Sequence, residues 1–143
     1  MLPPENDRTT GIRCAVPNGF SITPSSVLVI DDESAIAASM VYFLRPHKVE
    51  HAISGRLALQ RLRSKKFDIV LCDLLMPEMN GIELYQAVTK IWPCLHRSFV
   101  FMTGGATSNE TRLFLENTEN IRVAKPFSRD EIMLAIETQL HRP

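Results

Sequence analysis

The chain has 143 residues, which suits one domain of ordinary size and is short for two. Sixteen Lys and Arg residues balance sixteen Asp and Glu residues, and this neutral charge argues against direct binding to nucleic acid or to an anionic membrane. No apolar run approaches the roughly 18 residues of a membrane span, and the N-terminus lacks the apolar core of a signal peptide. We therefore expect a cytoplasmic protein without a membrane span.

Residues 1–25 are expected to form an N-terminal tail or linker. They contain four of the nine prolines and show no sustained hydrophobic period, so they lack the pattern of a packed element. The pattern changes at Ser26. We therefore expect one folded domain over residues 26–143.

From Ser26 onwards, short apolar runs alternate with helical patterns. The runs expected as strands are SVLVID (26–31), KVEHA (48–52), FDIVLCD (67–73), SFVFMT (98–103) and IRVA (121–124). Helices are expected at 33–44, from Ser54 with Leu57, Leu59 and Leu62 on its buried face, at 82–91, at 109–117 and at 128–140. Continuous apolar runs indicate strands buried on both faces of a sheet. The alternation predicts a doubly wound α/β domain, with a five-stranded parallel sheet covered by helices on both faces.

Polar side chains close four of the expected strands. Asp31 and Asp32 end the first, Asp73 the third, Thr103 the fourth and Lys125 the fifth. In open parallel sheets the functional site lies beyond the carboxyl ends of the strands, so these residues are expected at one edge. Three carboxylates there would repel one another without a divalent cation, and their hard oxygen ligands favour Mg²⁺ or Mn²⁺ over Zn²⁺.

These residue types are suited to phosphoryl transfer. The Asp73 carboxylate is placed as a nucleophile that can attack phosphorus and form an aspartyl phosphate. The metal and the Lys125 ammonium would neutralise charge on the transferred group, while the Thr103 hydroxyl could donate to one of its oxygens. Because such transfer depends chiefly on positioning and electrostatics, a small domain could manage it with a reactive donor.

Four of these residues also have a simpler structural interpretation. Asp31 and Asp32 could cap the helix that follows them. Asp73 could be a turn residue, and Lys125, before a proline, a solvated loop residue. Their joint occurrence at four strand ends favours the chemical interpretation. Glu33 is expected to begin a helix and not to bind metal directly.

The segments VLVIDDE, DIVLCDLLMPEMNGIEL, FVFMTGG and VAKPF, in this order and spacing, carry a family resemblance. Over about residues 26–140 the chain resembles the receiver domain of two-component response regulators. The resemblance implies a flavodoxin-like fold with strand order 2-1-3-4-5. It also implies that Asp73 is the phosphoacceptor and that Asp31 and Asp32 are the acidic pair.

The resemblance assigns further roles. It implies that Asp32 binds Mg²⁺ (or Mn²⁺) directly and that the Leu75 backbone carbonyl is another ligand. Thr103 corresponds to the signalling hydroxyl of the family and Lys125 to its lysine, followed by Pro126 at a cis-proline position. The phosphoryl donor would be a histidine kinase or a histidine phosphotransfer domain. The domain would be no enzyme beyond catalysing its own phosphorylation and dephosphorylation.

Two departures from the family pattern lead to hypotheses. Arg122 stands where receivers often carry an aromatic residue, so we expect movement of Thr103 to be read out through its loop and the ion pairs of Arg122. Leu75 and Gly105 stand where side chains influence hydrolysis, and neither side chain can orient a water molecule. This predicts a long-lived aspartyl phosphate.

The sequence leaves alternatives open about the parent protein and the function. FMTGGAT, FLEN and KPF resemble receivers at the C-terminus of hybrid sensor histidine kinases, and a free-standing regulator is the alternative. A scaffolding receiver that is never phosphorylated is a second possible function, which the retention of every chemical residue argues against. A haloacid-dehalogenase-like phosphatase is a third, but that family has D-x-D after its first strand, whereas Asp31 and Asp32 are adjacent.

Overall fold

The computed structural model describes residues 24–105 and 108–142. Its five strands are β1 (Ser26–Ile30), β2 (Lys48–Ala52), β3 (Ile69–Asp73), β4 (Phe99–Thr103) and β5 (Arg122–Ala124). The helices are α2 (Ser34–Phe43), α3 (Gly55–Ser64), α4 (Gly81–Ile91), α5 (Asn109–Asn117) and α6 (Arg129–Leu140), with a 3₁₀ helix η2 (Pro93–Ser98). All strand pairs are parallel and their order is β2-β1-β3-β4-β5, as predicted. The expected tail, 1–25, lies almost wholly outside the described residues.

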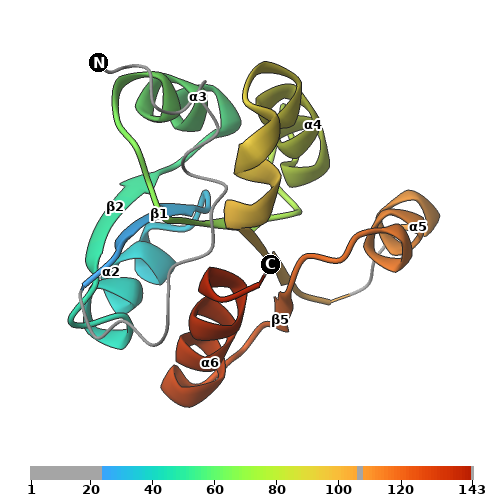
Figure 1. Cartoon of the computed structure of the whole chain (residues 1–143). Coiled ribbons are helices and arrows are strands. Elements are labelled where there is room, and N and C mark those ends of the chain that lie inside the picture. Colours follow the sequence, from blue (N-terminus) through green and yellow to red (C-terminus); the bar gives the residue numbers. More distant parts are fainter. Residues whose placement is uncertain (1–23, 106–107, 143) are drawn as a thin grey trace.

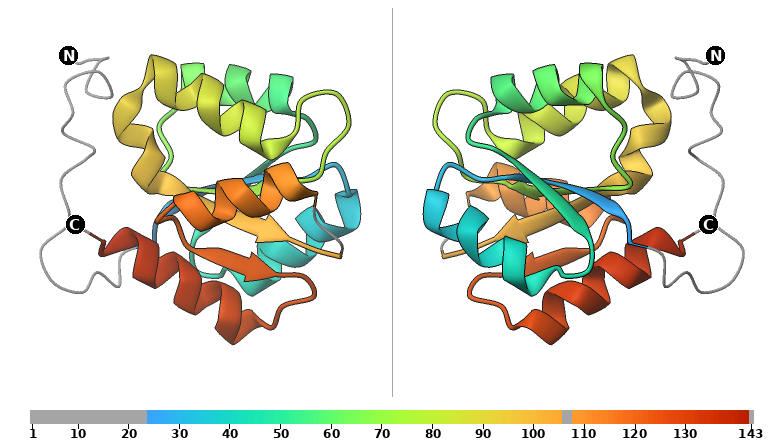
Figure 2. Two further views of the ribbon diagram at one scale, coloured as in Figure 1. Left: turned by 90° about the vertical axis from the view of Figure 1, so that its right-hand side faces the viewer. Right: turned by 90° about the vertical axis from the view of Figure 1, so that its left-hand side faces the viewer.

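Helices cover both faces of the sheet (Figures 1 and 2), and the buried residues form two hydrophobic cores, one on each face. Successive side chains of a strand point to opposite faces. In β1, Val27 and Val29 therefore face the side covered by α2 and α6, while Leu28 and Ile30 face the side covered by α3 and α4. The continuous apolar runs are thus explained, because β1, β3 and β4 each contribute side chains to both cores.

Side-chain caps begin four of the helices. Ser54, Asn80, Ser108 and Ser128 each accept a hydrogen bond from the backbone N–H three residues later, which satisfies a donor that the helix leaves free. Ser128 and Glu131 form a capping box, in which each side chain accepts a hydrogen bond from the backbone N–H of the other residue. Helix α2 differs, since its N-cap is Glu33 and no side chain caps it. The structural alternative in which Asp31 or Asp32 is the N-cap is therefore wrong.

The predicted buried face of α3 is partly wrong. Leu62 is buried and Leu59 packs against the core, but the Leu57 side chain is 41% exposed. The positions that face the sheet are Gly55, Ala58 and Leu62, which follow helical spacing. Leu57 lies off this stripe, so its apolar character misled the prediction. Residues 93–97, for which we expected no element, form η2 together with Ser98, which we expected to begin the fourth strand.

Gly81 allows α4 to begin directly against the end of β3. Its N–H donates to the Leu74 carbonyl at 3.1 Å. A Cβ atom at this position would lie 2.4 Å from the backbone oxygen of Asp73 and 2.9 Å from the Leu74 Cα. Only glycine permits this close approach, and the approach sets the backbone around Asp73.

None of the helices within residues 24–105 and 108–142 combines the length and the apolar character required to cross a membrane.

Candidate functional site

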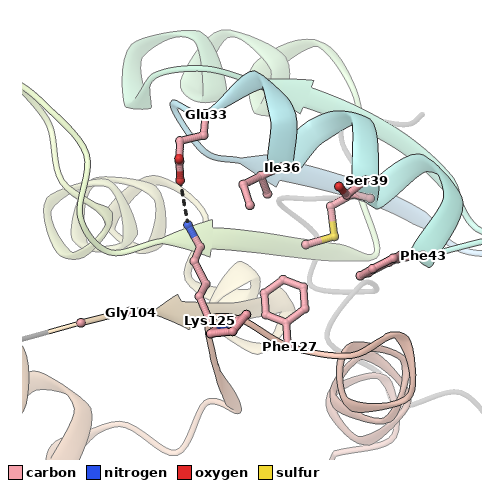
Figure 3. A pocket seen from close by; sticks show the side chains of 10 residues that line it. Glu33, Ile36, Ser39, Phe43, Gly104, Lys125 and Phe127 are labelled. Atoms are coloured by element: carbon pink, nitrogen blue, oxygen red, sulfur yellow. Dashed lines mark ion pairs between the residues drawn. The ribbon is translucent and has the colours of Figure 1, made fainter.

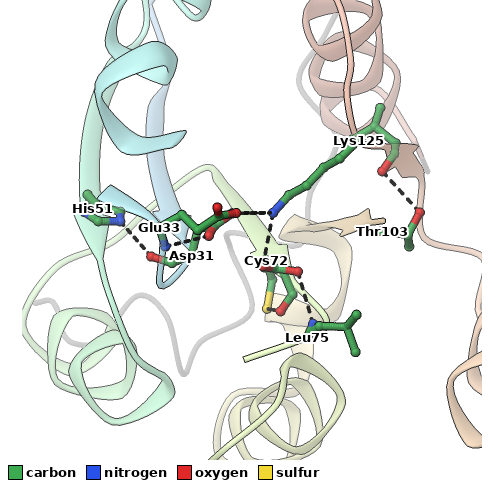
Figure 4. A network of polar contacts seen from close by, with 9 residues as sticks. Asp31, Glu33, His51, Cys72, Leu75, Thr103 and Lys125 are labelled. Atoms are coloured by element: carbon green, nitrogen blue, oxygen red, sulfur yellow. Dashed lines mark hydrogen bonds and ion pairs between the residues drawn. The ribbon is translucent and has the colours of Figure 1, made fainter. Parts of the chain in front are cut away.

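The carboxyl ends of β1, β3, β4 and β5 bring the predicted residues to one edge of the sheet (Figure 4). Asp31, Asp32 and Asp73 each offer a carboxylate oxygen, and these oxygens lie within 4.8 Å of one another. Lys125 reaches into the same cluster. Residues separated by up to 94 positions are therefore neighbours here, as the parallel topology predicted.

Asp31 is fully buried, and each of its polar groups has a partner. Its Oδ1 accepts from the Glu33 N–H at 2.9 Å, and its Oδ2 accepts from Lys125 Nζ at 2.7 Å. Its own N–H donates to the Ala52 carbonyl at 3.1 Å, and its carbonyl oxygen lies 2.9 Å from His51 Nε2. Asp31 is thus held by β2, by the start of α2 and by the residue after β5.

Asp32 differs from Asp31 in both exposure and bonding. Its side chain is exposed, and it makes no hydrogen bond or ion pair with the part of the chain that the structure describes. Its carboxylate nevertheless belongs to the acidic cluster. Asp32 is therefore the carboxylate of the three that is most available to an incoming cation.

Asp73 is only 6% exposed and lies at the end of β3. Its Oδ1 accepts from the Leu75 N–H at 3.1 Å, and its Oδ2 accepts from Lys125 Nζ, also at 3.1 Å. Burial raises the pKa of the Asp73 carboxyl above its usual range; the Leu75 N–H and the Lys125 ammonium oppose this, and the charge of Asp31 adds to it. A buried carboxylate with few hydration partners is well placed to act as a nucleophile.

Lys125 bridges the carboxylates. Its Nζ contacts Asp31 and Asp73, and it lies 3.9 Å from Glu33 Oε1. Burial alone would lower the pKa of Lys125, but hydrogen bonds and charge from Asp31 and Asp73 together raise it above its ordinary value. The side chain is therefore a fixed positive charge. The Lys125–Pro126 peptide bond is cis, as expected.

Thr103 lies at the same edge, but its hydroxyl does not contact the carboxylates. Its Oγ1 donates to the Val123 carbonyl at 3.4 Å, a long hydrogen bond. Its backbone carbonyl accepts from the Lys125 N–H at 2.6 Å, which ties β4 to the residue after β5. The hydroxyl is thus near the site and weakly held.

Arg122 and Cys72 have no visible part in the cluster. Arg122 is exposed on β5, and within the described residues it forms no ion pair, so the expected readout through its ion pairs has no starting partner in this structure. Cys72 is fully buried in the core, and burial raises the pKa of its thiol, with Asp73 and Asp31 adding to the effect. The thiol is therefore inert.

A largely apolar pocket of about 420 Å³ adjoins Lys125 (Figure 3). It lies between α2 and the segment after β5, and its apolar walls include Ile36, Met40, Phe43 and Phe127. Glu33 and Lys125 form its polar end. The pocket places an apolar surface directly beside the charged edge.

Two contacts at the site were not predicted. No sequence pattern connects His51 or the side chain of Glu33 with the carboxyl edge. The register of β1 against β2 would have placed His51 beside Val29, two residues before Asp31. That register follows from the sheet topology, but the direction of the ring does not.

The cluster is chemically suited to a hard divalent cation. Its ligand atoms are carboxylate oxygens only, which Mg²⁺ and Mn²⁺ prefer and which Zn²⁺ sites seldom use alone. Leu75 lies beside Asp73 and donates its N–H to that carboxylate, whereas a role for its carbonyl as a metal ligand stays a prediction.

Comparisons with known proteins agree with this arrangement. The family model for the response regulator receiver domain matches residues 27–137. The chain is 30% identical over 119 residues to the transcriptional regulatory protein CreB of Escherichia coli K12, covering 82% of this chain and 51% of CreB. It is 28% identical to the DNA-binding response regulator MtrA of Mycobacterium tuberculosis, covering 81% of this chain and 50% of MtrA. The chain thus spans about half the length of these curated relatives.

Solved structures agree with the fold. The crystal structure of a response regulator from Chloroflexus aurantiacus is 27% identical, has a TM-score of 0.73, and covers 84% of this chain and 100% of that chain. The chemotaxis protein CheY4 of Vibrio cholerae is 24% identical with a TM-score of 0.70, and covers 81% of this chain and 98% of CheY4.

Proposed function

The chain belongs to the response regulator receiver domain family, and on that premise we propose that Asp73 accepts a phosphoryl group from a histidine of a partner protein. The observation that carries this proposal is the environment of Asp73. Its buried carboxylate lies between the Leu75 N–H and the Lys125 ammonium, beside two further acids. The scaffolding alternative does not explain why these groups are held together, and membership of the family removes the phosphatase alternative.

In the proposed reaction an Asp73 carboxylate oxygen forms a bond to phosphorus as the P–N bond of the donor phosphohistidine breaks. The electron pair of that bond returns to the imidazole nitrogen. Lys125 neutralises charge beside the acceptor. The Thr103 hydroxyl can exchange its long bond to the Val123 carbonyl for a phosphoryl oxygen.

We propose Mg²⁺ (or Mn²⁺) as the cofactor, held by Asp31, Asp32, Asp73 and the Leu75 backbone carbonyl. Bound there, it would neutralise the charge of the carboxylates and of the phosphoryl oxygens. Because Lys125 already occupies one oxygen of Asp31 and one of Asp73, exposed Asp32 would be the main direct ligand.

The partners that we propose are a histidine kinase or a histidine phosphotransfer domain, in the cytoplasm. Phosphorylation would change a protein-binding surface around α5, β5 and α6, without direct nucleic-acid contact by the receiver. Apart from its own phosphorylation and dephosphorylation, we propose no enzyme activity for it. The sequence of the parent gene on either side of this chain would distinguish a hybrid kinase from a separate regulator.

Acetyl phosphate with Mg²⁺ tests the proposal. The intact mass should rise by one phosphoryl group, and neither the Asp73→Asn variant nor a sample with excess chelator should gain it. Asp130→Asn, which changes an exposed acid on α6, is the matched control and should be modified like the wild type. A wild-type chain that gains no phosphoryl group from acetyl phosphate or from phosphohistidine donors would refute the proposed function.

A further inference from the structure

The imidazole of His51 makes a hydrogen bond to β1 just beyond the last backbone hydrogen bond between β1 and β2. The last backbone bond of this pair runs from the Asp31 N–H to the Ala52 carbonyl at 3.1 Å. The next acceptor is the carbonyl oxygen of Asp31, and His51 Nε2 lies 2.9 Å from it (Figure 4). Because a carbonyl oxygen can only accept, Nε2 is the protonated donor.

This hydrogen bond determines the position of the first backbone atoms of Asp32. A peptide bond is planar, so fixing the Asp31 carbonyl also fixes the N and Cα atoms of Asp32. On the other side of Asp32, the Glu33 N–H is held by Asp31 Oδ1 at 2.9 Å. Asp32 is thus held by its two flanking peptides, while its side chain makes no bond within the described residues. Its position depends on the backbone alone.

We propose that His51 is a positioning residue for the metal site: its Nε2–H holds the Asp31–Asp32 peptide so that the exposed Asp32 carboxylate points at the cation. This inference rests on the proposed function, because it takes Asp32 as the direct Mg²⁺ ligand. The role belongs to the ring N–H, because the contact with the Asp31 carbonyl is a hydrogen bond of 2.9 Å.

The fold has other means of holding β2 in place. Five residue pairs join β1 to β2, and the Asp31 N–H bond to Ala52 does not involve the His51 ring. Loss of the imidazole should therefore leave the sheet intact and free only the peptide before Asp32. Metal affinity and thermal stability should respond differently to the same substitution.

The test uses Mn²⁺ alone, with binding followed by electron paramagnetic resonance and no phosphoryl donor present. His51→Leu keeps the bulk and removes the donor, and it should weaken Mn²⁺ binding about 10-fold, as loss of a residue that orients a metal ligand does. His51→Gln places an amide N–H₂ near the position of Nε2 and should restore most of the affinity. Both variants should unfold within a few degrees of the wild type.

Glu50→Gln is the matched control on the same strand. Glu50 pairs with Arg61 and Lys65 on the surface, so its loss should leave Mn²⁺ binding unchanged. Equal affinity of wild type and His51→Leu would overturn the inference and leave the proposed function standing. A wild-type chain that binds no Mn²⁺ would overturn the proposed metal site and this inference with it. Failure of His51→Gln to regain affinity would also count against the hydrogen bond as the cause.

Discussion

The two edges of the sheet use polar side chains in opposite ways. At the amino edge, Asp68 Oδ2 accepts from the Ser26 N–H at 2.8 Å, so a carboxylate holds the start of β1. Asn120 donates to the carbonyls of His96 and Phe99. Buried Gln139 accepts from the Ile121 N–H and donates to the Arg97 carbonyl. These side chains satisfy backbone groups where strands begin.

At the carboxyl edge, polar side chains face one another instead. Asp31 and Asp73 share the Lys125 ammonium, and Asp32 stands exposed beside them. Like charges close together cost free energy, and for Asp73 the Leu75 N–H and the Lys125 ammonium offset that cost only in part. The amino edge thus serves stability, whereas the carboxyl edge holds several charges close together, as the proposed cation site and phosphoryl acceptor require.

The largest expected effect on stability tests whether close backbone packing at Gly81 holds the carboxyl edge in place. Gly81→Ala would place a Cβ 2.4 Å from the Asp73 backbone oxygen. Displacing backbone atoms should lower the free energy of unfolding by about 3 kcal/mol, or the melting temperature by about 10 °C. Gly104→Ala is the control, because its Cβ would lie an ordinary 3.5 Å from Lys125. A fully stable Gly81→Ala variant would contradict the close approach.

The next effect tests the amino edge. Gln139→Ala leaves the Ile121 N–H and the Arg97 carbonyl without their side-chain partner, so the free energy of unfolding should fall by about 2 kcal/mol in urea titrations. Phosphorylation by acetyl phosphate should be unchanged once the variant is folded. Thr138→Ala, an exposed neighbour on α6, should change stability little. A variant as stable as the wild type would remove the amino edge's stabilising role.

Asp73→Asn, a substitution at the carboxyl edge, should raise the free energy of unfolding, whereas the two substitutions above should lower it. Burial raises the pKa of Asp73, so ionisation of this carboxyl in the fold costs stability. In metal-free protein at neutral pH, Asp73→Asn should therefore stabilise the chain by on the order of 1 kcal/mol.

The pH dependence follows from the same shift. Because the folded-state pKa lies above the ordinary value of 3.8, the cost develops as the pH rises through 3.8 to the folded-state pKa and is full above it. The gain from Asp73→Asn should therefore shrink as the pH falls toward 3.8. Urea titrations at neutral and acidic pH measure this gain in the free energy of unfolding. An Asp73→Asn variant less stable than the wild type at neutral pH would contradict the view that the charge of Asp73 costs stability.

The smallest expected effect concerns the lifetime of the phosphorylated state. The Leu75 side chain is 51% exposed beside the acceptor and cannot orient a water molecule. Leu75→Asn supplies an amide, so the aspartyl phosphate should decay about threefold faster, equivalent to about 0.6 kcal/mol of barrier. Leu113→Asn, at 52% exposure on α5, is the control. Unchanged or slower decay in Leu75→Asn would contradict a long-lived wild-type phosphate caused by Leu75.

Local sequence patterns were enough to predict most of the helices and strands. Continuous apolar runs predicted β1, β3 and β4, the short segments KVEHA and IRVA predicted β2 and β5, and the helices expected from Ser54 and at 128–140 begin at side-chain caps. The exception at Leu57 has a simple cause, since an apolar residue in a helix is buried only if it lies on the stripe that faces the sheet. Strand ends likewise predicted which residues share the carboxyl edge, because parallel strands direct those ends the same way.

Only the tertiary structure decided what each of these residues does there. Asp31 and Asp32 are neighbours in the sequence, yet one is fully buried and the other exposed. The bond from Lys125 to Asp31, across 94 residues, and the bond from His51 to the Asp31 carbonyl depend on strand register and side-chain direction. Hydrophobic periodicity determines elements because it is local, whereas these contacts join residues that only the packed sheet brings within hydrogen-bonding distance.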